Sequence, residues 1–356
     1  MYHLRLKGNH YQMGVKRGAI FQKAGISFPF HLDRFQLKYG KESEKILKEF
    51  FPEVCEEMRG VSDTLDLDYL TFASWMLCMG CCMYNLDENI PVEIRGCTAF
   101  AFSKGGRLIY GRNNDLPPFL RDGSKSEIYA PTKGYRFNIT TSSFINGEEG
   151  INEYGLAVAM TFVMTNLEKI KPGFNSCFIV RYLLEKADST QKAISLLMAL
   201  PIASNCNILL ADRVGHMVVV ECTPDKKSIR EAEIFHNGSI VCTVNSFTSA
   251  KMKQYDDAHG NDYDSAKRYE VVINSFSNYI NDDVVETTKK LLKGDYGFMC
   301  QYDKDLNFET VWSSIFDLDS LVIYRAEGDP RKKKFITDNR LHDIVKRKNV
   351  KLNIPK

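Results

Sequence analysis

The chain has 356 residues, of which 44% are hydrophobic and 12% aromatic, so it can bury a large core as one enzyme-sized unit. Its formal net charge of +2 gives no support for nucleic-acid binding, which would show as a basic patch or stripe. Two short basic runs, 331–334 and 346–351, are interpreted as solvent-exposed segments.

The first part of the chain predicts helices over 11–24, 42–61 and 67–84. The N-terminal residues lack the apolar stretch of a secretory signal, so we expect no such signal. Residues 69–84 are uncharged, but this stretch is short for a membrane span, which takes roughly 20 residues. The sequence therefore predicts a buried helix there and no membrane association.

The chain contains 10 cysteines. In the absence of a secretory signal they indicate reduced thiols and a cytoplasmic protein. Cys78 and Cys81 have the CxxC spacing of metal and redox sites, but no second Cys/His pair follows at a zinc-like distance. We expect no metal ion and no cofactor.

A hairpin is predicted next, with strands over 98–102 and 107–113 joined by a four-residue loop over 103–106. Pairing 102 with 107 places Cys97 directly opposite Arg112. Opposed side chains on one face of a sheet lie about 4.5–5.5 Å apart at Cβ, and a guanidinium at that distance favours the thiolate over the thiol. Asp115, at the end of the same hairpin, is expected to reach the same region.

Cys97 would become a self-contained nucleophile if the bond that joins it to Gly96 were cut. A free α-amine titrates at about 7.7–8.0 and can accept the thiol proton without a histidine. Asp115 would then hold the α-amine or orient Arg112. The alternative is structural, because a cysteine at the start of a strand is usually a small buried hydrophobic residue.

The remainder of the chain predicts an α+β protein. Strands are expected over 136–145, 156–163, 207–212, 216–222, 239–244 and 312–325, and helices over 176–185, 190–200, 264–275 and 283–293. Strands in two blocks with helices outside them suit a layered sandwich.

Five segments, in order along the chain, carry a family resemblance. They are Gly96-Cys97-Thr98 with Gly111-Arg112-Asn113-Asn114-Asp115, then 152–159, 243–247, 264–269 and 310–318. Together they resemble the N-terminal nucleophile (Ntn) hydrolases that cleave linear amides, a group that includes choloylglycine hydrolases, penicillin V acylases, acid ceramidase and isopenicillin N acyltransferases. Residues 4–14 and 58–61 resemble the prosegment of the acyltransferases, so this branch is the closest match.

The resemblance implies a four-layer αββα sandwich with an α-rich prosegment at 1–96 and a catalytic domain at 97–356. It also implies roles for individual residues. The cleavage site would be Gly96-Cys97, and the nucleophile would be Cys97. The charge network around this nucleophile would consist of Arg112, Asp115 and Arg268. The oxyanion hole would be formed by Asn245 and the backbone N–H of Phe162. As structural alternatives, Arg268 would belong to an ion-pair cluster, and Asn245 and Asn152 would be turn formers.

The implied function is a self-processing hydrolase that cleaves a linear amide of a small molecule through a Cys97 acyl-enzyme. Fungal acyltransferases have Gln where this chain has Arg112, which favours hydrolysis. An acyltransferase that moves the acyl group to an amine, and an unprocessed non-catalytic member, remain alternatives. A histidine-based thiol hydrolase is weaker, since His216, His236 and His259 have no partnering motif. The sequence leaves the oligomeric state open, including a homo-oligomer.

Overall fold

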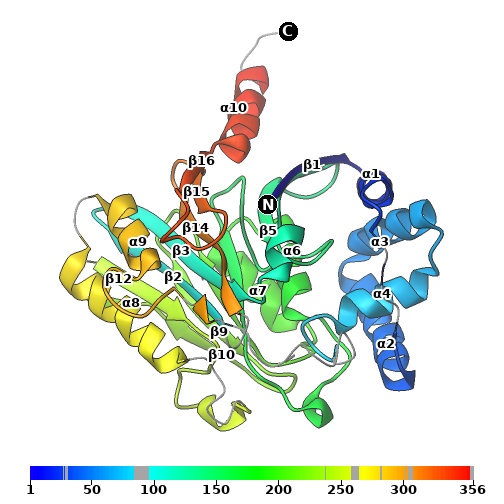
Figure 1. Ribbon diagram of the computed structural model, residues 1–356, viewed down its shortest axis with the longest axis horizontal. Coiled ribbons are helices and arrows are strands. Elements are labelled where there is room, and N and C mark those ends of the chain that lie inside the picture. The colour runs from blue at the N-terminus through cyan, green and yellow to red at the C-terminus, as the bar shows by residue number, and fades with distance from the viewer. Residues whose placement is uncertain are drawn as a thin grey trace.

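The computed structural model describes residues 1–26, 28, 31–83, 96–236, 238–257, 264–280, 283–300, 302–303 and 308–352. Two β-sheets lie face to face with helices on their outer sides, as Figure 1 shows. The α+β class and the αββα sandwich that the sequence predicts are confirmed.

The first sheet, sheet A, is mostly antiparallel. Its strand order is β1 (Tyr2–Gly8), β4 (Lys125–Pro131), β5 (Phe137–Thr141), β6 (Glu149–Asn152), β7 (Ala157–Phe162), β8 (Cys206–Ala211), β9 (Met217–Cys222) and β10 (Lys227–Glu231). The pairing of β1 with β4 is parallel. The N-terminal strand was not predicted, and it makes the start of the chain part of the sheet.

The second sheet, sheet B, contains the cysteine hairpin. Its order is β11 (Glu233–Phe235), β12 (Gly238–Thr243), β2 (Gly96–Lys104), β3 (Arg107–Leu116), β14 (Phe308–Asp317), β15 (Val322–Ala326) and β16 (Ile336–Asp338), and β13 (Tyr302–Asp303) pairs with β14. The single strand predicted over 312–325 is wrong. The chain turns back between β14 and β15, where Leu321 has a left-handed φ of 57°.

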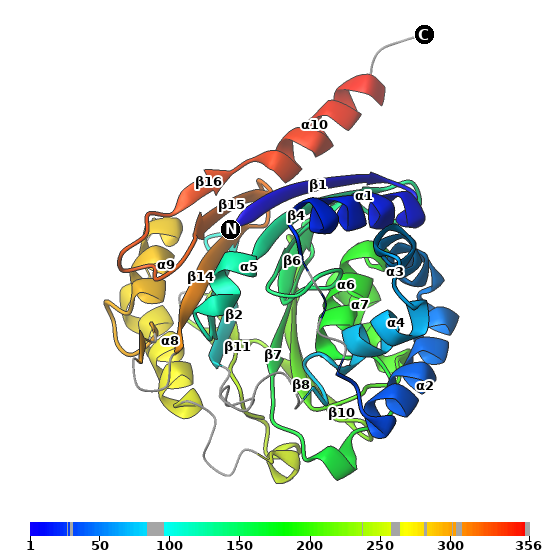
Figure 2. The ribbon, with the colours of Figure 1, turned by 45° about the vertical axis from the view of Figure 1, so that its right-hand side comes forward.

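Helices cover the outer face of each sheet (Figure 2). Sheet A is covered by α6 (Ser176–Lys186) and α7 (Thr190–Ala199), and sheet B by α8 (Ser265–Tyr279) and α9 (Val284–Lys293). Ser189 caps α7, since its side chain accepts the N–H of Lys192, and Gly294 ends α9 at a φ of 83°. The short α5 (Phe119–Gly123) lies between β3 and β4, and α10 (Arg340–Leu352) projects from the body.

Small residues line the space where the two sheets meet. Ala99 and Ala101 of β2 and Ala157 and Ala159 of β7 are all fully buried in one cluster. Side chains of this size allow two sheets to approach closely, which brings the Cys97 end of β2 close to β7.

The N-terminal segment, described here over 1–83 apart from residues 27, 29 and 30, contains α1 (His10–Lys23), α2 (Arg34–Phe50), α3 (Pro52–Leu65) and α4 (Tyr69–Cys78). The single helix predicted over 42–61 is wrong, because Pro52 begins a new helix. Phe51 before it has φ −142° and ψ 60°, which is not helical. Proline has no N–H for an interior helical bond but fits the first helical position. Within the described ranges, no helix combines the length and apolarity that a membrane span requires.

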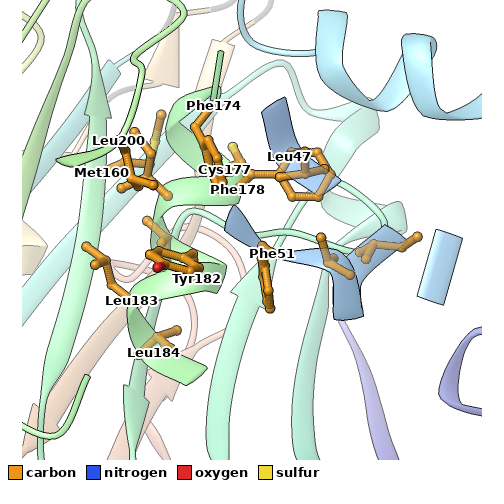
Figure 3. Packing of buried hydrophobic residues seen from close by; sticks show 14 of the residues in the cluster. Leu47, Phe51, Met160, Phe174, Cys177, Phe178, Tyr182, Leu183, Leu184 and Leu200 are labelled. Atoms are coloured by element: carbon orange, nitrogen blue, oxygen red, sulfur yellow. The ribbon is translucent and has the colours of Figure 1, made fainter. Parts of the chain in front are cut away.

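This N-terminal segment packs directly on the layer formed by α6. Leu47 and Phe51 lie beside Phe174 and Tyr182 (Figure 3), and the rings of Phe51 and Tyr182 meet edge to face with centroids 5.3 Å apart. All four side chains belong to one buried cluster. The segment therefore shares its hydrophobic core with the rest of the protein.

A buried ion-pair cluster joins the same two parts. Arg17 of α1 donates to both carboxylate oxygens of Glu127 in β4, at 2.7 and 2.6 Å. Glu57 of α3 accepts from Arg181 of α6 at 2.8 Å and from the Tyr129 hydroxyl at 2.9 Å. All five side chains are fully buried. Charges so deeply buried require such partners, so these ion pairs and hydrogen bonds join the two parts.

Candidate active site

The hairpin of β2 and β3 is tighter than the sequence predicts. Lys104 pairs with Arg107, so the loop is the two residues Gly105 and Gly106, with φ of 57° and 79°. A two-residue turn with positive φ at both positions suits the strand twist, and glycine adopts it without strain. As a result Cys97 lies opposite Asn114, and the predicted pairing of Cys97 with Arg112 is wrong.

Arg112 nevertheless contacts the thiol. A shift of two residues leaves a side chain on the same face of a sheet, and Arg112 lies opposite Ala99, one place along the face from Cys97. Its Nη2 donates to Cys97 Sγ at 3.2 Å. The other terminal nitrogen, Nη1, donates to the carbonyl of Met160 at 2.5 Å, which ties the guanidinium to β7 of the opposite sheet.

The Cys97 thiol is 4% exposed and hydrogen-bonded. Burial raises its pKa above the ordinary value, and the Arg112 guanidinium opposes this shift. Its S–H donates to Asn114 Oδ1 at 3.3 Å. In the continuous chain Cys97 is therefore held as a thiol, with the guanidinium charge that would stabilise a thiolate already beside it.

The backbone of Cys97 is held on both sides. Its N–H donates to Asn245 Oδ1 at 2.6 Å, and its carbonyl accepts from Arg268 Nη1 at 2.5 Å. Arg268 Nη2 also donates to Asn245 Oδ1, at 3.0 Å. Two residues separated from Cys97 by more than 140 positions along the chain thus meet at its peptide groups.

Asn245 and Phe162 lie side by side. Asn245 Nδ2 donates to the backbone carbonyl of Phe162 at 3.0 Å. The carbonyl of Val244, just before Asn245, accepts from Thr161 Oγ1 at 2.6 Å and from Asn207 Nδ2 at 3.0 Å. Side chains of sheet A therefore fix the segment of chain that carries Asn245.

Asp115 lies opposite Gly96, the first residue of the candidate cleavage bond. Its Oδ1 accepts from the Thr310 hydroxyl at 2.5 Å. Burial raises the pKa of Asp115 to about 7, against the opposing effects of Arg268 and the Thr310 hydrogen bond. The acceptor at the Cys97 nitrogen is Asn245, and the role of Asp115 toward an α-amine stays a prediction.

The raised pKa of Asp115 gives a testable pH dependence. Between about pH 4 and 7 the unfolded carboxyl is ionised while the folded one binds a proton, so the free energy of unfolding falls as pH rises, by up to about 1.4 kcal/mol per pH unit. Asp115→Asn removes this slope. Urea unfolding of the uncleaved Cys97→Ala protein, with and without Asp115→Asn, at pH 4.5, 6 and 7.5 measures it, and parallel curves for the two would contradict the assignment.

Two groups of residues at this site escaped sequence reasoning. Asn114 occupies the variable position of the Gly-Arg-Asn-Xaa-Asp motif, and the register error hid its contact with Cys97. Asn207 and Thr161 lie on strands predicted only as core. Asn152, by contrast, forms a turn: its Oδ1 accepts the N–H groups of Tyr154 and Leu156.

The histidine alternative gains no support from the described residues. The hydrogen bonds given above for Cys97 lead to Arg112, Asn114, Asn245 and Arg268. His216 is paired at 3.9 Å with Glu231, on β10 at the edge of sheet A, and His259 lies outside the described residues. Within the described ranges, no group of three or more His, Cys, Asp or Glu side chains gathers as a metal site requires.

Comparison with known proteins finds proteins similar to this chain. A family model described as acyl-coenzyme A:6-aminopenicillanic acid acyl-transferase matches residues 102–332. No curated protein gives a significant match. Among solved structures, a variant of conjugated bile acid hydrolase from Clostridium perfringens aligns with a TM-score of 0.50 and 16% identity, covering 68% of this chain and 92% of that one.

Two other solved structures align over similar lengths. Penicillin V acylase from Agrobacterium tumefaciens has 16% identity and a TM-score of 0.42, covering 65% of this chain and 83% of that one. The Caenorhabditis elegans ortholog of N-acylethanolamine-hydrolyzing acid amidase has 14% identity and a TM-score of 0.45, covering 62% and 93%. At 16% identity, the alignment with the bile acid hydrolase shows a shared fold.

Proposed function

The chain belongs to the acyl-coenzyme A:6-aminopenicillanic acid acyl-transferase family, and from this premise we propose that it is a self-processing cysteine hydrolase of linear amides. The observation that carries the proposal is the set of contacts at one residue. The Arg112 guanidinium donates to the Cys97 sulfur at 3.2 Å, and the Asn245 side-chain oxygen accepts the Cys97 N–H at 2.6 Å. These are the two atoms that an N-terminal cysteine nucleophile uses.

The first reaction is cleavage of the bond between Gly96 and Cys97. Cys97 Sγ attacks the Gly96 carbonyl carbon, a C–S bond forms, the C–N bond breaks, and the nitrogen takes the thiol proton. Water then hydrolyses the thioester, and residues 1–96 become a separate chain. Arg268, on the Cys97 carbonyl, and Asn245, on the Cys97 N–H, hold the peptide while the bond breaks.

Each later turnover acts on an amide of a small molecule. The new α-amine takes the thiol proton, and Cys97 Sγ attacks the substrate carbonyl carbon to form a C–S bond. The substrate C–N bond then breaks, the amine leaves with the proton that the α-ammonium held, and water hydrolyses the thioester to the free acid. Asn245 Nδ2 and the Phe162 N–H are the proposed donors to the oxyanion. In the continuous chain one N–H of Asn245 Nδ2 donates to the Phe162 carbonyl, and the second N–H of the same nitrogen is the one proposed for the oxyanion. Losing one such donor costs about 10²–10³ in rate.

Acyl transfer is the second candidate, and the family description favours it. The same residues serve both reactions, since only the group that resolves the acyl-enzyme differs. Adding an amine acceptor at increasing concentration separates the two: a hydrolase gives free acid throughout, whereas a transferase diverts product to the new amide. We also propose a cytoplasmic location, which is supported by the 10 cysteines all being free.

The mass of the purified protein tests self-processing. Cleavage before Cys97 converts the 40.7 kDa chain into fragments of about 11 and about 30 kDa. Cys97→Ala leaves one species of full mass, because no nucleophile remains. Cys242→Ala, a buried cysteine on the neighbouring strand β12, is the control and is cleaved like the wild type. Wild-type protein that stays at full mass on long incubation, like Cys97→Ala, would refute the proposal.

A further inference from the structure

Asn114 lies at the centre of the contacts around the nucleophile. It is fully buried and opposite Cys97 across the hairpin. Its Oδ1 accepts the Cys97 S–H at 3.3 Å and the Nε–H of Arg112 at 3.2 Å. Arg112 Nη2, which also donates to the sulfur, donates to the same oxygen at 2.5 Å. One amide oxygen therefore connects the thiol to the guanidinium.

The other end of the same amide is unsatisfied. Among the described residues, Asn114 Nδ2 is buried and has no hydrogen-bond partner. Leaving a buried donor unpaired is costly, so the contacts of Oδ1 must determine which way the amide faces. The orientation of the Asn114 amide is thus fixed by its hydrogen bonds with Cys97 and Arg112.

These contacts have a chemical consequence for the thiol. An acceptor oxygen on S–H stabilises the thiol and repels the thiolate, because a thiolate has no proton to donate. The same oxygen also takes two of the N–H groups of Arg112, whose positive charge stabilises the thiolate. Asn114 therefore opposes ionisation of Cys97 in two ways, directly and through Arg112.

We propose that Asn114 is a further catalytic residue, whose Oδ1 holds Cys97 as a thiol tied to Arg112 until the reaction removes the proton. The proposal rests on Cys97 being the nucleophile. It predicts that the polarity of this one side chain, at the variable position of the motif, sets how readily the nucleophile ionises. Among the described residues, the charged groups that also act electrostatically on Cys97 include Asp115 of β3, Arg268 of α8 and Glu148, which directly precedes β6.

The test is the pH dependence of Cys97 alkylation by iodoacetamide, followed by peptide mass on the full purified chain. The midpoint pH is compared rather than the rate, since access to a buried sulfur also affects the rate. Asn114→Leu removes the acceptor and frees Arg112, so the midpoint falls by about one pH unit. Asn114→Asp puts a negative charge beside the sulfur and neutralises Arg112, so the midpoint rises by about one pH unit or more.

Asn113→Leu is the matched control. Asn113 is equally buried on the same strand, but it faces the other side of the sheet and donates to the carbonyls of Leu292 and Met299. Its loss lowers stability and leaves the midpoint unchanged. A midpoint within about 0.2 pH unit of wild type in either Asn114 variant that folds, a shift of the opposite sign, or an equal shift in the control overturns the proposal. Each variant is compared with wild type in the same cleavage state, established by intact mass, because a new α-amine on Cys97 would itself shift the midpoint. The midpoint is measurable in either state, so a failure of self-processing is a separate result.

Discussion

Arg268→Gln is expected to slow self-cleavage at Gly96-Cys97 by at least about 100-fold. The guanidinium donates to the Cys97 carbonyl at 2.5 Å, to the Thr98 hydroxyl at 2.8 Å and to Asn245 Oδ1 at 3.0 Å. Glutamine is too short and has too few donors to serve all three acceptors. The Cys97 carbonyl, next to the scissile bond, and Asn245, which holds the Cys97 nitrogen, then lose their common support. Intact mass against time measures the effect, with circular dichroism to establish that the variant folds.

Arg268→Lys separates charge from geometry. Lysine keeps the positive charge but offers a single ammonium in place of a planar fork, so it cannot reproduce the divergent hydrogen bonds. We expect a cleavage rate between those of the wild type and Arg268→Gln. If Arg268→Gln is folded and is cleaved at the wild-type rate, Arg268 belongs to a structural ion-pair cluster, which is the alternative that its sequence context left open.

Glu57→Ala is expected to lower the free energy of unfolding by about 3–5 kcal/mol. Glu57 accepts from Arg181 at 2.8 Å and from the Tyr129 hydroxyl at 2.9 Å, and it lies 3.6 Å from Arg17. Removing the carboxylate leaves two guanidinium groups in a site where every side chain is fully buried. Urea unfolding of the Cys97→Ala protein, with and without the second substitution, measures the loss on an uncleaved chain.

The neighbouring Glu56 provides the control for Glu57. It is an exposed side chain that pairs with Arg59 at the surface, at 3.8 Å. Surface pairs of this kind contribute little, so Glu56→Ala is expected to change stability by no more than about 0.5 kcal/mol. Similar losses in the two variants would mean that the buried cluster contributes no more than a surface charge does.

The parts of the fold that could be predicted are those with local signals. Ser189 and Gly294 mark helix ends by their own chemistry, and most strands after Cys97 follow from apolar runs. The strand β4 could not be predicted because it contains Lys125 and Glu127, which are typical of loops, yet both are buried. Glu127 is tolerated there only because Arg17, from a distant helix, pairs with it. Such a partner is visible only in three dimensions.

For the candidate site, the sequence predicts which side chains share a face of the hairpin, but it does not predict which of them lie opposite each other. The alternation of side chains puts Arg112 and Cys97 on one face whether the hairpin loop has two residues or four. The position along that face depends on the turn, and the sequence Ser103-Lys104-Gly105-Gly106 permits both lengths. For this reason Arg112 could be named from the sequence, whereas Asn114, which the turn alone brings opposite Cys97, could not.

The shared core of the N-terminal segment has a consequence for the proposed processing. The continuous chain folds in a unimolecular reaction, with β1, α1 and α3 tethered to the sheet and helix they pack on. Once the bond before Cys97 is cut, the same native structure can be regained only by the meeting of two chains, so its stability becomes dependent on protein concentration. Processing would then leave the fold unchanged, but the cleaved protein would not refold after unfolding unless its two chains met again.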